Sequence, residues 1–571
     1  MKRCPECRRD YYDDSLLYCL EDGTALVQGA VPTADGHETA ILPAAVATGD
    51  EPTRAQISGN EGTLRGAPPN SRRKAKVVSL FALATIVILG IAFFGYRYSS
   101  AEAKQINSIA VLPFENHSGS GDTDYLSDGL TDSLIFRFSQ LPNIKVSPTS
   151  SVMRYKGSSK DVADIAKELD VDGVLSGRLT QVGDNLSISV QLIDARTKKL
   201  VWAEQYDRKM ADLLATQREI ATTLTQKMQL HLAGDEKGIA KKYTSSSEAY
   251  QLYLKGRYFW SKRTKDDLLR SVENYKQAIA LDPAFALAYV GMAETYNSMA
   301  KDPDVAPKDA VPFAKAAAAH ALEIDPTLAE AHSAMGDSLA IYDWNWSEAE
   351  RELNKALELD PDVAYIHLVY SGSYLGPVGR TADAVRESEK AVELEPAALI
   401  NNSVLASSYI YARQFDKALA QAKRSVELEP NFPLARYWLA MAYVASGNND
   451  QAISVATEIS KDSPAFPMKL VAMGHAYARS GKKADAEEQI TELRQLSLTR
   501  YIRRYYIASI YASLGDADKA FAELEACLLE KDVFITRVNS DPFMDPIRND
   551  RRFGTLLKRM GLPASAGGHD Q

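Results

Sequence analysis

Residues 397–430, AALINNSVLASSYIYARQFDKALAQAKRSVELEP, carry the pattern that decides the fold of most of this chain. A small residue, Ala406, lies three positions before Tyr409, and Ala418 and a terminal Glu-Pro dipeptide follow. Residues 431–464 repeat these positions at the same spacing and end on Ser-Pro. Because proline lacks an amide hydrogen and its ring clashes with the preceding turn, each run predicts two helices followed by a stop.

The same positions recur from about residue 245 to residue 532, mostly at steps of 34 or 35 residues. The alanine position holds Ala314, Ala349, Ala384, Ala418, Ala452, Ala486 and Ala520. The tyrosine position holds Tyr296, Tyr374, Tyr409, Tyr443, Tyr477 and Tyr511, with Leu339 as the single replacement. Small side chains let the two helices of a hairpin approach closely, and the tyrosine fills the space between hairpins. The pattern predicts a mostly α chain built around an α-solenoid of about eight helical hairpins over 245–532.

These hairpins resemble the tetratricopeptide repeat, a helical hairpin of about 34 residues with the same small, aromatic and proline positions. The resemblance implies a superhelix whose long concave groove binds a protein or an extended peptide. Side chains of the first helix of each hairpin are the candidates for contacting such a partner. They are Tyr437, Met441, His475, Arg479 and Tyr505.

The end of the solenoid requires a cap, because the last hairpin would otherwise expose its apolar side. Residues 533–563 are predicted to supply a C-terminal capping helix, since Phe553 and Leu556 recur at helical spacing after an Asp-Pro start. Cys527 occupies a position where earlier hairpins have alanine. We therefore expect it to be a small buried residue and not a reactive thiol.

Residues 105–233 are predicted to form one small α/β domain ahead of the solenoid. The apolar run 108–114 predicts a buried strand, and the spacing of leucines over 125–140 predicts a helix. Apolar residues then alternate with polar ones over 186–192, as in an antiparallel strand with one buried face. A helix over 212–232 closes the domain.

Two stretches of this domain carry a family resemblance, NSIAVLPFENHSGSGDTDYLSDGLTDSL (107–134) and VDGVLSGRLTQVGDNLSISVQLIDARTKKLVWAEQYD (171–207). They resemble the amino-terminal domain of TolB-type proteins and are similar to a related module in bacterial adenylate cyclases and kinases. The resemblance implies an extracytoplasmic interaction module with no known chemistry. His117, Asp128 and Asp132 are acid or base groups, but a polar loop and a helix start explain them more simply than catalysis.

Residues 77–96, VVSLFALATIVILGIAFFGY, run without a charge and predict a single transmembrane helix, because twenty helical residues span about 30 Å. Four basic residues lie between 72 and 76, and fewer follow the span. The positive-inside rule therefore predicts a single-pass protein of the inner (plasma) membrane with a cytoplasmic N-terminus and a periplasmic or otherwise extracytoplasmic bulk. Residues 28–70, rich in Ala, Gly, Pro and Thr, are predicted to be a flexible linker.

Three of the four cysteines lie within residues 1–27, where Cys4, Cys7, Cys19 and Asp22 have the spacing of two metal-binding knuckles. Thiolates and a carboxylate can bind zinc in a tetrahedral site that leaves no position open for catalysis. The segment CPECRRDYYDDSLLYCLEDGTALV resembles the short zinc ribbon at the start of many bacterial membrane-anchored regulatory proteins, in which the second knuckle normally supplies another cysteine. We predict a structural zinc, and the alternative is a degenerate ribbon that folds weakly without metal.

The chain lacks the motifs of the common enzyme classes. The sequence has no GxxxxGK[ST], HRD, DFG, GxSxG or HExxH pattern, so we expect neither an enzyme nor a small-molecule substrate. With 66 Lys and Arg against 75 Asp and Glu, the net charge is −9, and no nucleic-acid partner is expected. The leading hypothesis is a membrane-anchored scaffold for protein–protein interaction on the extracytoplasmic side. The alternative is a signalling protein that relays an external binding event to a cytoplasmic effector through the ribbon.

Overall fold

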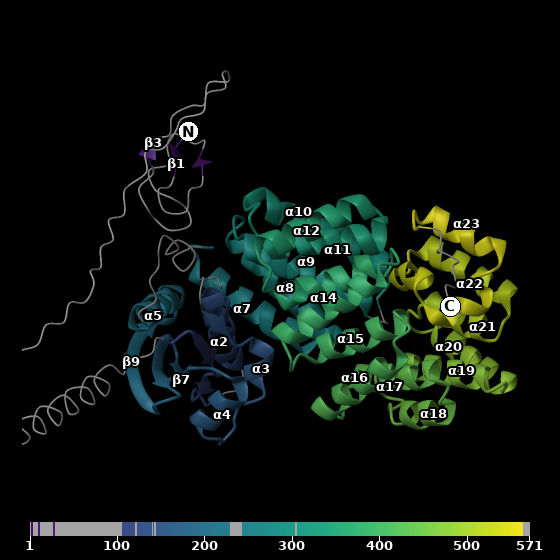
Figure 1. Ribbon diagram of the computed structural model, residues 1–571. Helices are drawn as coiled ribbons and strands as arrows, with labels where there is room; N and C mark the ends of the chain where they lie inside the picture. The colour runs from purple at the N-terminus through teal and green to yellow at the C-terminus, as the bar shows by residue number, and fades with distance from the viewer. Residues whose placement is uncertain are drawn as a thin grey trace, which may run out of the picture. The chain divides into compact units, whose positions relative to one another are not determined.

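The computed structural model divides the chain into two compact bodies, residues 1–100 and residues 101–571 (Figure 1). The structure describes residues 106–119, 123–139, 141, 144–228, 243–302 and 305–563, and the backbone of three short strands within residues 1–28. The predicted transmembrane helix, nearly all of the predicted linker and the four predicted zinc ligands lie outside the described residues. Within the described part of the chain, no helix is both long and apolar enough to cross a membrane.

The first body contains a small antiparallel sheet in the order β2-β1-β3. Its strands are β1 (Lys2–Arg3), β2 (Asp10–Tyr11) and β3 (Val27–Gln28). The central strand pairs with both neighbours, so that Lys2 lies opposite Tyr11 on one side and Gln28 on the other.

The second body begins with a six-stranded sheet in the order β6-β4-β7-β8-β9, and a short strand, β5, also pairs with β7. The strands are β4 (Ser108–Val111), β5 (Glu115–Asn116), β6 (Lys145–Val146), β7 (Gly173–Val182), β8 (Asn185–Asp194) and β9 (Lys199–Lys209). The helices of this region are α2 (Asp124–Ser139), α3 (Thr149–Met153), α4 (Val162–Leu169) and α5 (Leu213–Lys227), with a 3-10 turn, η2 (Met210–Asp212), before α5. The predicted small α/β region is therefore present.

The alternating residues of β7, β8 and β9 give the sheet one apolar face. Leu175 lies opposite Leu192, and Leu179 opposite Ile188, which in turn lies opposite Tyr206. All five of these side chains are buried. Because successive side chains of a strand point to opposite faces, the intervening Ser187, Ser189 and Gln191 of β8 lie on the other, polar face.

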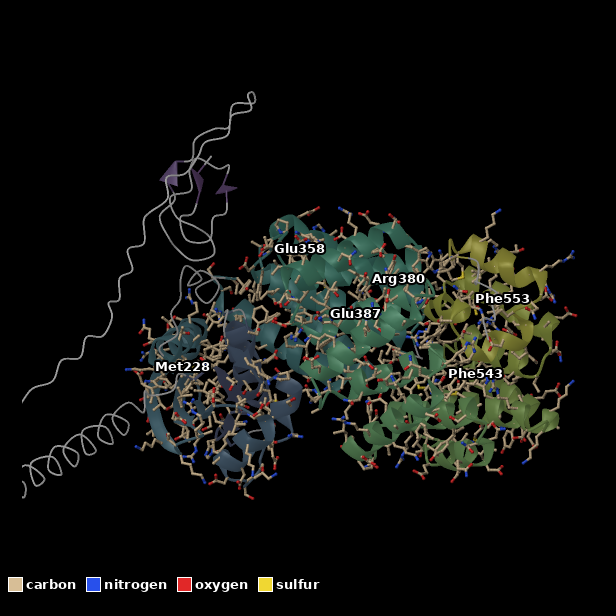
Figure 2. All side chains as sticks on the ribbon, viewed as in Figure 1. Met228, Glu358, Arg380, Glu387, Phe543 and Phe553 are labelled. Carbon is tan, nitrogen blue, oxygen red and sulfur yellow. The ribbon has the colours of Figure 1, made fainter. Side chains whose placement is uncertain are left out.

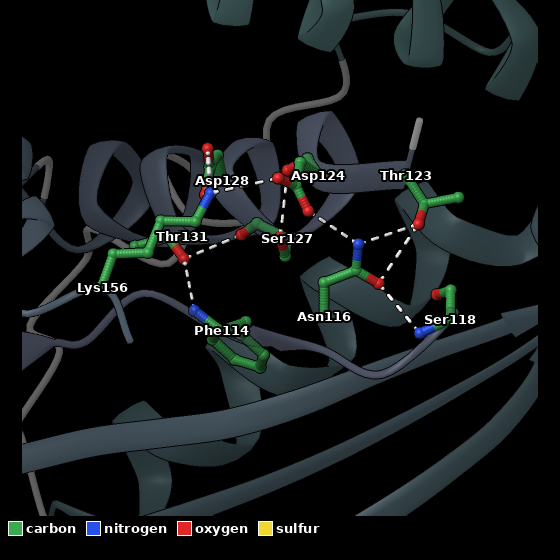
Figure 3. Close-up of polar contacts among 9 residues, drawn as sticks. All are labelled: Phe114, Asn116, Ser118, Thr123, Asp124, Ser127, Asp128, Thr131 and Lys156. Atoms are coloured by element: carbon green, nitrogen blue, oxygen red, sulfur yellow. Dashed lines mark hydrogen bonds and ion pairs between the residues drawn. The ribbon is translucent and has the colours of Figure 1, made fainter. Parts of the chain in front are cut away.

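A polar network ties the start of α2 to the strand that precedes it (Figure 3). The backbone amide of Phe114 donates to the Thr131 hydroxyl at 3.1 Å. The Asn116 side chain donates to Thr123 at 2.9 Å and to Asp124 at 2.7 Å. These bonds fix α2 against the sheet, and α2 is the helix that meets the helical array.

The remainder of the second body is a series of paired helices. The pairs are α7 (Ser247–Lys262) with α8 (Lys265–Leu281), α9 (Ala286–Lys301) with α10 (Val311–Ile324), α11 (Ala329–Ser338) with α12 (Trp346–Leu359), α13 (Ala364–Val369) with α14 (Thr381–Leu394), α15 (Leu399–Tyr411) with α16 (Phe415–Leu428), α17 (Pro433–Ala445) with α18 (Asn449–Thr457), α19 (Phe466–Arg479) with α20 (Lys483–Leu496), and α21 (Arg504–Ser513) with α22 (Ala517–Glu530). A 3-10 turn, η3 (Pro307–Asp309), precedes α10, and π-helical turns, η4 (Leu339–Asp343) and η5 (Tyr370–Leu375), follow α11 and α13. The predicted mostly helical chain with hairpins of about 34 residues is confirmed.

The sheet region and the first helical pairs share one hydrophobic core. A single cluster of buried residues runs from Ile106 on the sheet side to Ala331 on α11. At the junction, α2 packs on α7 so closely that a Cβ atom on Gly129 would lie 3.0 Å from Leu254. The sequence boundary between the predicted domains therefore does not separate two cores.

The chain ends in two 3-10 segments and a short helix, η6 (Val533–Asn539), η7 (Pro542–Ile547) and α23 (Arg551–Arg559). The capping helix predicted over 533–563 is thus observed only over α23. Phe553, Leu556 and Leu557 of α23 are buried, as their spacing predicted. Residues 533–547 are called the C-terminal segment from here on. They do not form a helix of the array but lie against the first helix of several of the later pairs.

Candidate functional site

The first helices of successive pairs contact one another, as α15 contacts α17, α17 contacts α19 and α19 contacts α21. They therefore lie on the inside of the curved array, and we call the residues that they turn inward the inner face. One inner-face position follows directly after the small residue of each first helix. From the first pair to the last it holds Arg257, Glu294, Asp337, Gly372, Ser407, Met441, His475 and Ser509. Charged residues occupy this position in the first three pairs, and uncharged ones occupy it in the other five.

The charged half of the inner face is held by ion pairs between neighbouring helices. Arg257 of α7 bonds to Glu294 of α9 at 3.1 Å and lies 3.6 Å from Asp132 of α2. Lys301 at the end of α9 bonds to Asp337 of α11 at 2.7 Å. Arg257, Asp132 and Lys301 each keep 27–32% of their side-chain surface exposed, so these charges remain within reach of solvent.

An aromatic group lies next to these charges. The Arg263 guanidinium lies 3.7 Å from the centre of the Trp260 ring, and Arg257 lies 4.7 Å from it. Tyr365 of α13 meets Trp260 edge-on, with 5.8 Å between the ring centres. All four side chains are half-buried. Stacked arginine and aromatic side chains of this kind are typical anchors in protein interfaces.

Two glutamates of this half have altered acidity. Burial first, and the neighbouring Glu294 and Asp360 second, raise the pKa of Glu330, on α11, to about 7. Burial also raises the pKa of Glu395, although the Ser150 hydroxyl of α3 bonds to that carboxylate at 3.1 Å. This half of the inner face therefore holds a carboxyl group that changes charge near neutral pH.

The other half of the inner face is covered by the chain itself. The C-terminal segment lies against α15–α21 with Ile535, Val538, Phe543, Met544 and Ile547 buried. Figure 2 shows Phe543 among the side chains of these last pairs. The predicted solenoid groove is thus filled by residues 533–547 over its second half.

The five predicted partner-contacting residues lie in this second half. Tyr437, Met441, His475 and Tyr505 are buried, and Arg479 is exposed. The Phe543 ring centre lies 4.6 Å from that of His475 and 5.2 Å from the Arg479 guanidinium. The Tyr505 hydroxyl donates to Asp541 at 2.7 Å. In this structure His475, Arg479 and Tyr505 contact the C-terminal segment, and the contact of all five residues with a separate partner stays a prediction.

Burial dominates the chemistry of His475. Its two ring nitrogens lie 2.7 Å from the Ser513 hydroxyl and 3.1 Å from that of Ser509. Burial first and the nearby Arg479 second lower the pKa of His475 from 6.5 to about 3. The imidazole is therefore neutral at physiological pH, and its ring serves as a packing surface for Phe543.

Sequence reasoning missed the charged half of the inner face. The inner-face position directly follows the small residue of each first helix. Arg257, Glu294 and Asp337 could therefore have been predicted to share one face of the array. No sequence pattern predicted that residues 533–547 would cover the second half of the inner face, because their apolar residues have no helical or strand period.

The other side chains singled out from the sequence have structural partners. Asp128 bonds to Lys156 at 2.7 Å, and His117 bonds to Glu115 at 3.0 Å. Cys527 is fully buried, which confirms the prediction, and burial raises the pKa of its thiol. Among the described residues, no group of three or more His, Cys, Asp or Glu side chains is arranged to hold a metal ion. The predicted ligands Cys4, Cys7, Cys19 and Asp22 are not among those residues.

Comparisons with known proteins bear on both parts of the second body. Residues 409–468 match a family model described as tetratricopeptide repeat. The chain carries tetratricopeptide repeats. Residues 104–223, ahead of the tetratricopeptide repeats, match the model of the HilA/YgeH-like transcriptional regulator second domain. The predicted TolB-type likeness stays a prediction.

Two curated proteins are similar to parts of the chain. A putative adenylate cyclase 3 of Rhizobium meliloti is 30% identical over 187 residues, 33% of this chain and 32% of that protein. The transcriptional regulator HilA of Salmonella typhimurium is 24% identical over 255 residues, 42% of this chain and 44% of that protein. The chain therefore spans 32% of the length of the first relative and 44% of the length of the second.

Among solved structures, PilF of Pseudomonas aeruginosa is 20% identical, and the match covers 38% of this chain and 94% of that one. Its TM-score of 0.29 is too low to support an argument.

Proposed function

We propose that this protein is a docking scaffold that binds a segment of another protein on the charged half of the inner face, beside α2 and α3. The observation that carries the proposal is the contrast between the two halves. The first half keeps half-buried arginine, lysine, tryptophan and tyrosine side chains, whereas the second half is filled by the C-terminal segment. Curved helical repeats use such inner surfaces to bind extended segments of partners.

The chemistry of this half favours a partner with mixed charges. Trp260 and Tyr365 offer apolar rings to a partner side chain, and Arg257 and Lys301 offer cations that are already partly paired. Glu330 offers a carboxylate that is most available above neutral pH, because its pKa is raised to about 7. A lysine or arginine of the partner would lower that pKa and gain a charge-assisted hydrogen bond.

Photo-crosslinking tests this docking surface directly. A Trp260→benzoylphenylalanine variant of the full chain, expressed in its native host, is expected to crosslink a discrete partner. The matched variant Lys355→benzoylphenylalanine places the same probe on α12, a second helix of the array. Equal crosslinking from both positions, or none from position 260, would contradict the proposal.

We propose further that the chain is anchored by residues 77–96, with its N-terminus in the cytoplasm and the repeats on the extracytoplasmic side. The uncharged run and the basic residues before it support this orientation. Reporter fusions at residues 60 and 240 are expected to report opposite sides of the membrane. Two cytoplasmic reports would overturn the orientation.

A second candidate function is signalling. The curated relatives are named as a putative adenylate cyclase and a transcriptional regulator, both regulatory classes of protein. In this candidate, binding on the repeats is relayed to a cytoplasmic effector through a ribbon held by zinc on Cys4, Cys7, Cys19 and Asp22. The purified full chain should contain stoichiometric zinc, and the C4S/C7S double variant should contain none. The double variant should also fail to signal, although its repeats should still bind the partner.

A further inference from the structure

The C-terminal segment contacts the second half of the inner face in the way a bound peptide would. Its central side chain is Phe543, whose ring lies between the His475 ring at 4.6 Å and the Arg479 guanidinium at 5.2 Å. Both residues belong to α19, and both are inner-face positions. Phe543 is almost fully buried there, so it is the apolar anchor of the segment.

Two carboxylates flank this anchor at equal spacing, Asp541 two residues before it and Asp545 two residues after it. Asp541 accepts a hydrogen bond from the Tyr505 hydroxyl at 2.7 Å. Asp545 accepts two bonds from the Arg413 guanidinium, at 2.7 and 2.8 Å. The inner face thus supplies a hydroxyl at one side of the aromatic ring, and the turn between α15 and α16 supplies a bidentate arginine at the other.

The backbone of the segment also suits a peptide ligand. Pro542 and Pro546 each follow one of the two aspartates, and proline restricts the conformations that a free segment loses on binding. Residues Pro542–Ile547 form the 3-10 segment η7, which does not continue the repeat pattern. The side chains of Asp541, Phe543 and Asp545 contact α21, α19 and the turn after α15.

The two ends of residues 541–547 are not bound equally strongly to the array. Phe543 and Met544 are buried, but the Arg413–Asp545 pair is nearly half exposed on both sides. Exposed ion pairs contribute little to stability because solvent screens them, so the Asp545 end is the weaker one. A competing peptide would first gain contact at this end.

We propose that the second half of the inner face is a docking site for peptides with an aromatic residue flanked by aspartates two positions before and two positions after it. Asp541–Ile547 is the resident occupant, which the partner's segment displaces. This inference does not depend on the docking surface proposed for the first half, because it concerns different helices and a different ligand chemistry.

Tethering explains why a trans peptide would bind the intact chain weakly. A segment on a short connection acts at an effective concentration of about 1 mM. A trans peptide with an intrinsic Kd of about 10 μM would then show an apparent Kd about a hundredfold higher, because it competes with that segment. Loosening the resident segment should restore much of this affinity.

Fluorescence anisotropy with the full chain tests the proposal. The probe is a fluorescein-labelled peptide of residues 538–549, VNSDPFMDPIRN, and its control is the same peptide with Phe543→Ala. The intact chain is expected to bind the probe weakly. A chain with Phe543→Ala is expected to bind the probe at least 10-fold more tightly than the intact chain does. It should not bind the control peptide.

A milder variant protects the test against misfolding. Asp545→Ala removes the exposed ion pair with Arg413 and a contact with Arg548 inside the segment, but none of its apolar anchors. The chain should therefore keep its fold and bind the probe about 2–5-fold more tightly than the intact chain. Adding Arg413→Ala to that variant should weaken probe binding again, because the Asp545 carboxylate of the probe then has no guanidinium to bind. If a folded Asp545→Ala chain binds the probe no better than the control peptide, the proposal is wrong. If either variant forms dimers without added probe, the site would instead bind the C-terminal segment of a second copy, and the proposal would also be wrong.

Discussion

Tyr275 sets the distance between the first helical pairs, because its ring lies between two glycines of different helices. A Cβ atom on Gly256 of α7 or on Gly291 of α9 would lie 2.4 Å from this ring. The ring itself is fully buried, so it has no room to move away. The glycines at these positions serve close packing, and neither has a positive φ.

We expect Gly291→Ala to destabilise the second body by about 1–2 kcal/mol, because overpacking costs more than the gain in helix propensity. Chemical unfolding followed by circular dichroism measures the effect. Gly554→Ala is the matched control, since nothing lies within 4 Å of its Cβ position on α23. The control should be neutral or slightly stabilising, and an equal loss in both variants would contradict the packing argument.

His475 makes the stability of the repeats depend on pH. The pKa of His475 is about 3 in the folded chain and 6.5 when the side chain is exposed. Below pH 6.5 the unfolded chain therefore binds a proton on His475 that the folded chain does not bind. The folded state therefore loses stability as the pH falls through 6.5, by about 2 kcal/mol between pH 8 and pH 5.

The measurement compares unfolding midpoints of the intact chain and of His475→Gln at pH 8, 6 and 5. Glutamine can still bond to Ser509 and Ser513 but does not titrate. The midpoint difference between the two chains should therefore change with pH in favour of the variant at pH 5. Parallel pH curves would mean that His475 does not carry the effect.

At the scale of elements, α23 is held mainly by its apolar side. Phe553, Leu556 and Leu557 are almost fully buried against the last repeats. Its ion pairs with α22, Arg552–Asp518 and Arg559–Glu525, are largely exposed and so contribute little.

We therefore expect Leu556→Ala to cost about 2–4 kcal/mol and Arg559→Ala less than about 1 kcal/mol. Hydrogen exchange of the α23 amides is the suitable readout, because loss of a terminal helix precedes global unfolding. Leu556→Ala should raise exchange throughout α23, whereas Arg559→Ala should leave it close to that of the intact chain. The reverse order would indicate that charge, and not apolar burial, holds the cap.

The helical pairs were predictable from sequence because each relies on local rules. Small residues such as Gly336, whose Cβ position lies 2.6 Å from Leu353 of α12, mark the close contact within a pair, and proline after the second helix marks its end. The path of residues 533–547 was not predictable, because the helices that hold Asp541 and Phe543, through Tyr505 and His475, lie more than 30 residues away in the sequence. Such contacts leave no period in the sequence.

For the whole second body, Arg503 joins the end of the array to its beginning. The side chain is fully buried and donates to the backbone oxygens of Ala300 at 3.0 Å and Asp302 at 2.7 Å. It also lies 3.5 Å from Asp532, which is equally buried. The last helical pair is thereby bonded to the end of α9 in the second pair.

An apolar cluster surrounds this junction. Val533 of η6 packs with Tyr296, Val305 and Ile341, which come from the second and third pairs and their connections. The Arg503 guanidinium also lies 4.5 Å from the Phe534 ring centre. The array is therefore closed by one buried cation and a small hydrophobic cluster, and this closure keeps the C-terminal segment against the inner face.

Arg503→Met should open this junction, because it leaves Asp532 buried without a cation and removes two bonds to α9. Removing one partner of a buried ion pair costs about 3–5 kcal/mol. The neighbouring Arg504→Met is the control, since Arg504 pairs with Glu530 in a partly exposed position and should cost less than about 1 kcal/mol. Small-angle scattering should give a larger radius of gyration for Arg503→Met alone. If its unfolding midpoint and its scattering both match those of the intact chain, the array is closed by the apolar cluster without help from Arg503.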